Sequence, residues 1–325
     1  CRAMRSTLSR CLLPVLIVVA LGVVPIFALS GYTLFQFTLV VAYALAVLGL
    51  NMVTGYNGQI SLGHGAFYAI GAYTTAIMMD HWDLPYWSTI PVAAVLCAIF
   101  GFLIGLPALR FGGLYLALTT LALAAAVPQL LKFNAVSDWT GGVQGISVMK
   151  PDAPFGLPLN PDQWLYLFSF AVALVLFVLA RNLAVGRIGR AMKAIRDQPL
   201  AAEAMGVNLA GVKTRSFAIS AVFTGVGGSL AAIAVGFVSP DSFNVTLSIT
   251  LFVGMVVGGA ASISGARFGA LFIQFIPNVA DQISKAAPGA IYGLILIVFR
   301  FVAPGGIASL VRKYRPFRKA PVRPG

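Results

Sequence analysis

Charged residues are scarce in this sequence. Asp, Glu, Lys and Arg make up only 10% of its 325 residues, whereas hydrophobic residues make up 59%. A soluble domain typically carries about 25% charged residues, so the composition excludes an ordinary soluble protein. The apolar runs are about 20 residues long, which suits helices that cross a bilayer rather than the shorter strands of a membrane barrel. The sequence therefore predicts an all-α, polytopic integral membrane protein.

The sequence also lacks the patterns that catalysis or nucleotide binding would need. No G-x-x-x-x-G-K-[ST] loop occurs, which excludes a nucleotide site of the P-loop type. The two histidines and three cysteines have no metal-binding or redox spacing, and H-E-x-x-H is absent. No serine–lysine or serine–histidine pairing indicates an intramembrane hydrolase. We therefore expect no catalytic residue, no metal site and no cofactor bound by this chain.

Apolar segments predict about ten membrane-spanning helices in one transmembrane domain, 1–325. Their approximate limits are 11–29, 35–53, 59–79, 89–109, 114–131, 164–180, 212–236, 247–262, 268–283 and 290–302. We divide the domain into a first group of spans (11–131), an external loop (132–163), a second group of spans (164–304) and a basic tail (305–325). Between the second and third spans, 54–58 is predicted to be a tight turn.

Basic residues are distributed unevenly between the two predicted sides of the membrane. With ten spans and the N-terminus inside, 19 of the 22 Lys and Arg residues fall on the inner side. Only Lys132, Lys150 and Lys285 fall outside. Cytoplasmic loops carry an excess of Lys and Arg. We therefore expect both termini to be cytoplasmic.

Small residues recur every four positions along two of the predicted spans. They are Ser220, Thr224, Gly228, Ala232 and Gly236 on the seventh, and Gly254, Gly258 and Ser262 on the eighth. Small residues let helices approach closely where lipid provides no hydrophobic force between them. The pattern predicts tight helix packing, and the alternative is a pair of surfaces that slide in a moving transporter.

One polar segment, 181–215, interrupts the apolar sequence with seven basic residues and two acids. Residues 188–196 read as a short basic helix, which Asp197-Gln198-Pro199 breaks. Pro199 suits the first turn of a second helix over 200–205, because its missing N–H would be unpaired there anyway. Gly206 suits a left-handed C-terminal cap. This ordered content predicts a docking element, whereas the alternative is a basic surface loop against anionic lipid.

A second polar segment, 50–67, lies where the second and third predicted spans meet and reads LNMVTGYNGQISLGHGAF. Polar groups in spanning segments are costly unless they face protein or water. A glycine-rich, broken helix at membrane depth is one way to build a solute path. The candidate path residues are Asn51, Asn57, Gln59, Ser61 and His64. The alternative is that these side chains only bond neighbouring helices.

Three stretches resemble the LivM family, the permeases of ABC importers for branched-chain amino acids. They are AIRDQPLAAEAMGVNLAGVKTRSFAISAVFTGVGGSLAA, LNMVTGYNGQISLGHGAFYAIGAYTTA, and RFGGLYLALTTLALAAAVPQLL followed by WTGGVQGI. The resemblance implies a multi-pass permease of the bacterial cytoplasmic (inner) membrane that works with two ABC ATPase subunits. It also implies a second related permease and an external solute-binding protein. ATP would be used by the partner subunits, and no nucleic acid would bind.

In that family a Glu-Ala-Ala-like stretch followed by glycine inserts into a groove of the ATPase subunit. The resemblance therefore implies that 181–215 is the cytoplasmic coupling loop. Basic residues and Glu203 would make polar contacts, and Leu200, Ala204 and Met205 would form the apolar face. The expected coupling residues are Arg190, Lys193, Arg196, Asp197, Pro199, Leu200, Ala202, Glu203, Ala204 and Gly206.

Other functions stay open at this point. Urea or a short amide is the nearest alternative solute within the same superfamily. A stand-alone secondary carrier would need no docking partner, but the predicted spans lack the internal lysine or carboxylate that proton or sodium coupling requires. An intramembrane enzyme would need a nucleophile or metal set, which the sequence does not contain.

Overall fold

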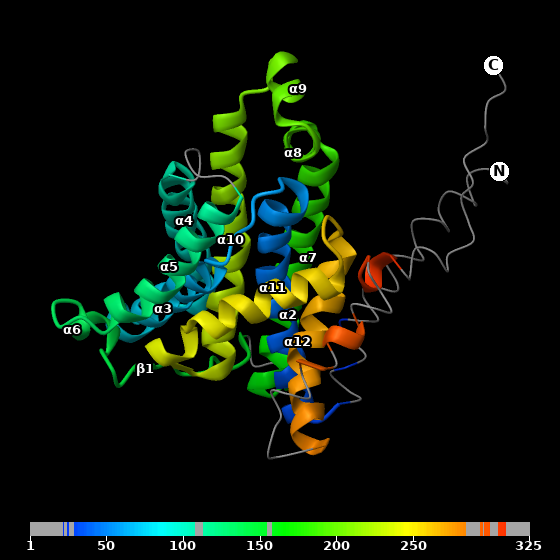
Figure 1. Ribbon diagram of the computed structural model, residues 1–325. Coiled ribbons are helices and arrows are strands. Elements are labelled where there is room, and N and C mark those ends of the chain that lie inside the picture. Colours follow the sequence, from blue (N-terminus) through cyan, green and yellow to red (C-terminus); the bar gives the residue numbers. More distant parts are fainter. Residues whose placement is uncertain are drawn as a thin grey trace, which may run out of the picture.

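The computed structural model describes residues 29–107, 113–154 and 158–283, together with 22, 25, 293–294, 296–299 and 305–309. Within these residues the chain is an almost entirely helical, multi-pass membrane protein, which confirms the predicted class (Figure 1). Five described helices are long and apolar enough to cross a membrane. The count of ten spans and the side on which each terminus lies stay predictions. Most of the first and tenth predicted spans and the tail beyond 309 lie outside the described residues.

Helices account for nearly all the regular structure in the described part of the chain. They are α2 (Gly31–Leu50), the π-helix η1 (Asn51–Tyr56), α3 (His64–Trp82), α4 (Tyr86–Gly105), α5 (Leu114–Leu131), α6 (Ser137–Thr140), α7 (Pro161–Val185), α8 (Arg187–Asp197), α9 (Pro199–Ala204), α10 (Leu209–Val235), the 3-10 helix η4 (Pro240–Phe243), α11 (Val245–Gly258) and α12 (Ile263–Ile283). Two short strands, β1 (Ile146–Ser147) and β2 (Phe237–Val238), pair antiparallel.

Polar side chains mark where several of these helices begin. Asn208 and Asn244 each accept a hydrogen bond from a backbone N–H in the first turn of α10 and α11. Before α7, the side chain of Gln163 accepts a hydrogen bond from the backbone N–H of Asn160. The first N–H groups of a helix have no partner inside it, so these side chains satisfy donors that would otherwise be unpaired. Isolated polar residues therefore set helix limits in an otherwise apolar sequence.

The predicted limits of the second to ninth spans lie within five residues of the observed helices, and the conformation itself differs between the second and third spans. The helices predicted at 188–196 and 200–205 match α8 and α9 to one residue at each end. The tight turn predicted at 54–58 is wrong, because α2 continues as a π-helix through Tyr56. The third span begins at His64 rather than at 59, since 59–63 has no regular secondary structure. Side-chain hydrogen bonds hold this irregular stretch, and hydropathy cannot detect them.

Helix α10 lies at the centre of the bundle and packs against α2, α3 and α4. Its small residues allow the close approach that their four-residue spacing predicted. The backbone of Tyr68 on α3 lies against Gly228, and Gly49 on α2 lies against Thr224. Gly258 on α11 meets Gly265 on α12 in the same way. The stripes are therefore packing surfaces, because any larger side chain would collide with a neighbouring backbone.

Short polar contacts tie the loops together at the end of α10 that is remote from α8 and α9. Lys132 pairs with Asp241 at 2.5 Å, and Lys150 pairs with Asp162 at 3.0 Å. The β1–β2 pair lies at the same end, and α8 and α9 lie at the other (Figure 1). Exposed ion pairs add little stability individually. Together with the strand pair, they hold residues 132–154 beside the end of α10.

Candidate functional site

Helices α8 and α9 form a hairpin that projects beyond one end of the bundle (Figure 1). Helix α8 is amphipathic: Met192 and Ile195 are buried against the body of the protein, whereas Arg187 and Arg190 are exposed. At the tip of the hairpin, large apolar side chains are exposed. Met205 is 85% exposed and Leu200 is 79% exposed. Exposed apolar groups on a projecting element mark an interaction surface.

The hairpin has a rigid internal structure, and its limits are those the sequence predicted. Pro199 occupies the first helical position of α9. At the end of α9, the N–H of Val207 bonds to the carbonyl of Ala202 at 3.0 Å, and the N–H of Gly206 bonds to the carbonyl of Glu203 at 2.9 Å. This pair of hydrogen bonds is a Schellman motif, which needs a residue with a left-handed backbone conformation directly after the C-cap residue of the helix. Gly206 adopts this conformation, with φ +82°, and no atom lies near the position that a Cβ would occupy.

Two of the expected coupling residues turn back toward α7. The guanidinium of Arg190 donates to the carbonyl of Val185 at 3.0 Å, and the Lys193 ammonium donates to the carbonyl of Ala184 at 3.4 Å. The last carbonyls of a helix lack partners within the helix, and cations stabilise that end. Arg190 and Lys193 therefore fix the position of the hairpin on the end of α7. Exposed Glu203 at the tip remains available for an outside partner.

Arg196 connects the hairpin to the bundle. Its guanidinium donates to the carbonyl of Gly55 in the π-helix at 3.0 Å and pairs with Asp197 at 2.9 Å. Its aliphatic stem lies over Gly58, where an added Cβ would come within 2.7 Å of Arg196 Cγ. Lys193 also lies 5.3 Å from the ring centroid of Tyr56. The hairpin therefore contacts the stretch 51–64, which we call the junction segment.

The junction segment is bonded in turn to the loop between α11 and α12. The side-chain amide of Asn51 donates to the carbonyl of Ser262 at 2.7 Å and accepts from the N–H of Ala261 at 2.7 Å. The amide nitrogen and the amide oxygen of this buried side chain are therefore both hydrogen-bonded. The π-helix that carries Asn51 is a conformation that occurs mostly as single turns at functional sites. Asn51 therefore joins α2 to the second half of the chain.

Replacing Asn51 with alanine should lower the stability of the folded protein. The change leaves the carbonyl of Ser262 and the N–H of Ala261 without their partner, and each unpaired buried group costs about 1–3 kcal/mol. The measurement is the midpoint of thermal unfolding in detergent. Asn182→Ala, at an exposed position on α7, is the matched control and should unfold at the wild-type temperature. Equal midpoints for the two variants would contradict this assignment.

Further side chains hold the part of the junction segment that follows the π-helix and has no regular secondary structure. The Thr54 hydroxyl donates to the carbonyl of Gln59 at 3.0 Å, and the Asn57 amide donates to Oε1 of Gln59 at 2.6 Å. The backbone N–H of Gln59 donates to the carbonyl of Val53 at 3.1 Å. The other amide atom of Asn57, its Oδ1, is buried and has no partner within the described residues.

His64, at the start of α3, bonds to two different parts of the chain. Its Nδ1 lies 3.1 Å from the Ser61 hydroxyl, and its Nε2 bonds to the hydroxyl of Ser220 on α10. Next to it, the N–H of Gly65 donates to the hydroxyl of Ser248 on α11 at 2.9 Å. The Ser248 hydroxyl thus takes the place of a helical carbonyl for one N–H in the first turn of α3.

These contacts describe the environment of the five candidate path residues. Asn51, Asn57, Gln59, Ser61 and His64 are each at most 8% exposed. All five lie in the junction segment, and the side chain of each makes at least one hydrogen bond, either within the segment or to a neighbouring element. This arrangement favours the alternative reading, a network between helices. A role in the solute path stays a prediction.

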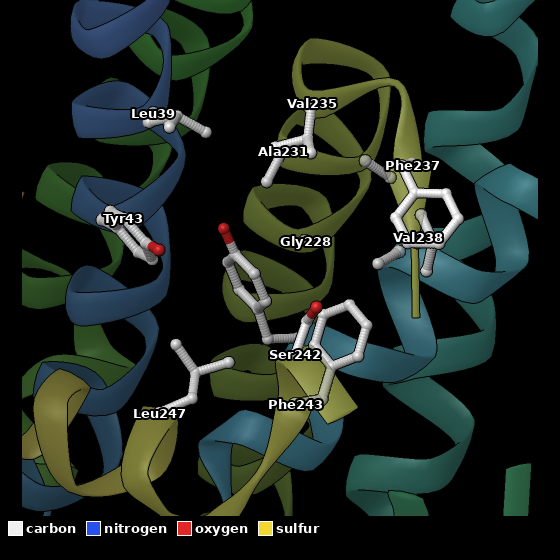
Figure 2. A pocket seen from close by; sticks show the side chains of 13 residues that line it. Leu39, Tyr43, Gly228, Ala231, Val235, Phe237, Val238, Ser242, Phe243 and Leu247 are labelled. Atoms are coloured by element: carbon white, nitrogen blue, oxygen red, sulfur yellow. The ribbon is translucent and has the colours of Figure 1, made fainter. Parts of the chain in front are cut away.

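The sequence did not point to a second feature, a cavity of about 130 Å³ at the other end of α10. In Figure 2, Leu39 and Tyr43 from α2 lie on one side of it, and Phe237 and Val238 from β2 lie on the other. Phe243 from η4 closes a further side. These residues come from segments about 200 positions apart in the chain, so no local pattern predicts that they meet. The aromatic residues that line it are visible in the sequence, but nothing in their spacing joins them.

Comparison with known proteins identifies the family. A family model described as "Branched-chain amino acid transport system / permease component" matches residues 32–302. The permease LivM of Escherichia coli K12 is 33% identical, over 89% of this chain and 70% of that protein. LivH of the same strain is 26% identical, over 83% and 92%, and BraD of Pseudomonas aeruginosa is 28% identical, over 82% and 91%. No solved structure matches. The chain belongs to the family of branched-chain amino acid transport permeases.

Proposed function

We propose that this permease carries branched-chain amino acids across the bacterial inner membrane, driven by ATP that separate subunits hydrolyse. Its relatives are high-affinity branched-chain amino acid transport permeases, and this supports the solute class. The sequence has no P-loop motif, so ATP would be used by the partner subunits and no cofactor would be held by this chain. A urea or amide importer is disfavoured by these relatives.

The observation that carries the proposal is the α8–α9 hairpin. It presents Leu200 and Met205 at its tip, and it contacts the junction segment through Arg196. An ATPase groove that received this tip would bury apolar surface, which is favourable, and would place Glu203 among polar groups at the rim. Two such ATPase subunits would act on the assembly, one on each permease.

A second permease and an external binding protein complete the proposed importer. Escherichia coli K12 has both a LivM and a LivH that are similar to this chain, which supports a pair of related permeases. The solute-binding protein would dock at the end of the bundle that carries β1, β2 and η4, opposite the hairpin. This placement follows from the predicted topology, in which 132–163 is external.

Movement would pass from the hairpin to the bundle through direct contacts. A rigid Schellman-capped hairpin transmits displacement rather than absorbing it. Arg196 would pull on the carbonyl of Gly55, and Asn51 would carry the shift to the loop between α11 and α12. His64 would carry it to α10. Because α10 runs to the other end of the bundle, displacement at the hairpin can alter both ends in turn.

Replacing Met205 with glutamate should release the ATPase subunits from the complex. The change puts a charge on a surface that would be desolvated in the groove, and a single central interface residue is often worth 2 kcal/mol or more, which corresponds to about a 30-fold loss of affinity. The measurement is the amount of ATPase that co-purifies with the tagged permease. Met149→Glu is the matched control, because Met149 is 87% exposed but lies at the opposite end. Equal co-purification of ATPase with both variants would contradict the assignment of the hairpin tip as the docking surface.

A further inference from the structure

The cavity beside β2 and η4 has no assigned role. Its walls come from α2, α3, α10, β2, η4 and α11. The rings of Tyr43 and Tyr68 stack with an interplanar angle of 11° and centroids 5.9 Å apart, and Phe243 lies 6.2 Å from Tyr68. No charged residue is among the lining residues. Ser242 and the two tyrosines contribute the hydroxyl groups.

We propose that this cavity receives the hydrocarbon side chain of the transported amino acid early in its passage. The proposal rests on the proposed function above. A zwitterion has two charged ends that need strong polar partners, and no charged side chain lines the cavity to pair with either end. An aliphatic side chain needs only apolar walls, and the cavity offers flat rings and the small residues Gly228 and Ala231. The charged ends would therefore stay at the mouth of the cavity.

The volume selects the size of the side chain. An apolar cavity of about 150 Å³ in a protein core binds benzene. A cavity of 130 Å³ accordingly has room for the branched side chain of valine, leucine or isoleucine. Urea and short amides would bury several N–H groups against walls that are mostly rings and aliphatic carbons, where three hydroxyl groups cannot satisfy them all, which is unfavourable. The cavity thus favours an apolar side chain over the alternative solutes of the superfamily.

The position of the cavity agrees with a binding site that the solute would reach early in its passage. It lies at the end of α10 that is remote from the hairpin, where the binding protein would deliver its solute. Gly228 and Ala231, which line it, lie on the same face of α10 as Thr224, which packs against Gly49 of α2. A displacement between α10 and α2 that began at the hairpin would therefore change the cavity. Solute would be held in one state of the importer and released in the other.

Photo-leucine, a leucine analogue with an aliphatic diazirine, tests the proposal in the assembled importer. The complex is reconstituted in liposomes and first shown to take up leucine on addition of ATP; failure at this step, or uptake of urea instead, would overturn the proposed function itself. In the competent complex, irradiation should label cavity peptides that contain Tyr43, Tyr68 or Phe243. Excess leucine should suppress the labelling, and urea should not.

Two outcomes in a transport-competent complex would overturn the cavity assignment alone. One is photo-leucine labelling only elsewhere in the permease. The other is labelling of the cavity peptides by a diazirine fatty acid that leucine does not compete away, which would make the occupant a lipid chain.

Variants that fill the cavity provide an independent measurement. Ala231→Leu adds bulk from the α10 wall, and Val235→Trp adds it at the mouth, where Val235 is 47% exposed and the fold is at less risk. Both should lower the initial rate of leucine uptake by about ten-fold or more and should abolish photo-labelling, while ATPase co-purification stays normal. Ala171→Leu, at an exposed position on α7, is the control. Normal uptake by a correctly assembled Val235→Trp complex would also overturn the proposal.

Discussion

Replacing Gly71 with alanine should remove most of the folded permease from the membrane. Gly71 lies on α3 at its crossing with α10, and an added Cβ would come within 2.5 Å of the carbonyl carbon of Gly225 and 2.6 Å of its Cα. The obstacle is backbone in the middle of a long helix, so no side-chain rotation relieves the collision. The Ser229 hydroxyl, which donates to the carbonyl of Gly71 at 3.0 Å, fixes the crossing further. Overpacking of this kind costs about 3 kcal/mol or more.

Gly211→Ala on α10 is the matched control for this variant. Its added Cβ would meet only the side chain of Asn208, at 3.4 Å. Alanine is favoured over glycine in a helix by about 1 kcal/mol, so Gly211→Ala should be neutral or stabilising. The measurement is the monodisperse peak of detergent extracts in size-exclusion chromatography, followed by the unfolding midpoint of the recovered protein. A Gly71→Ala permease that is recovered and unfolds like Gly211→Ala would refute the close crossing of α3 and α10.

Replacing Arg196 with glutamine should separate ATP hydrolysis from transport. The hairpin would keep its exposed tip, because Leu200 and Met205 are unchanged, so ATPase subunits should still co-purify. The charged hydrogen bond from Arg196 to the carbonyl of Gly55 would be lost, and with it the contact that carries movement to the junction segment. Hydrogen bonds from charged groups contribute about 1.5–3 kcal/mol. We expect the solute moved per ATP hydrolysed to fall by about ten-fold or more, which corresponds to 1.4 kcal/mol.

Two further variants make the Arg196 result specific. Arg187→Gln removes one charge from the other end of the same helix, where the side chain is exposed, and should leave the ratio of transport to hydrolysis unchanged. Arg196→Lys keeps the charge but loses the planar, multi-donor geometry of the guanidinium, so it should restore only part of the ratio. Loss of ATPase from the Arg196→Gln complex would instead place Arg196 in the docking surface. An unchanged ratio would remove it from the transmission route.

The class of the protein and the limits of the hairpin were predictable because each depends on local sequence. Long apolar runs with few charges predict spanning helices wherever the partners lie. Pro199 and Gly206 each act on the backbone of their own turn, so α9 could be placed to one residue at each end. The small-residue stripe of α10 was likewise visible from its spacing, although the sequence does not say which helix packs against it.

The junction segment shows where local reasoning failed. Its residues were singled out as polar and glycine-rich, but their conformation was predicted as a turn. The π-helix is held by Asn51, whose partners Ala261 and Ser262 lie about 210 residues away. A hydrogen bond of that separation cannot be read from hydropathy or spacing. For the same reason the sequence could not show that Arg196 of the hairpin would reach the carbonyl of Gly55.

The sequence by itself determined that this protein is a helical membrane protein, roughly where most of its helices lie, and which polar loop forms a pair of short helices. These properties follow from the free energy of placing apolar and polar groups in a bilayer and from backbone preferences within a few residues. Only the tertiary structure decided that the hairpin, the junction segment and α10 form one chain of contacts, and that aromatic residues of α2, α3 and η4 enclose a cavity. Those features depend on side chains from distant segments packing at one place, which no local property of the sequence encodes.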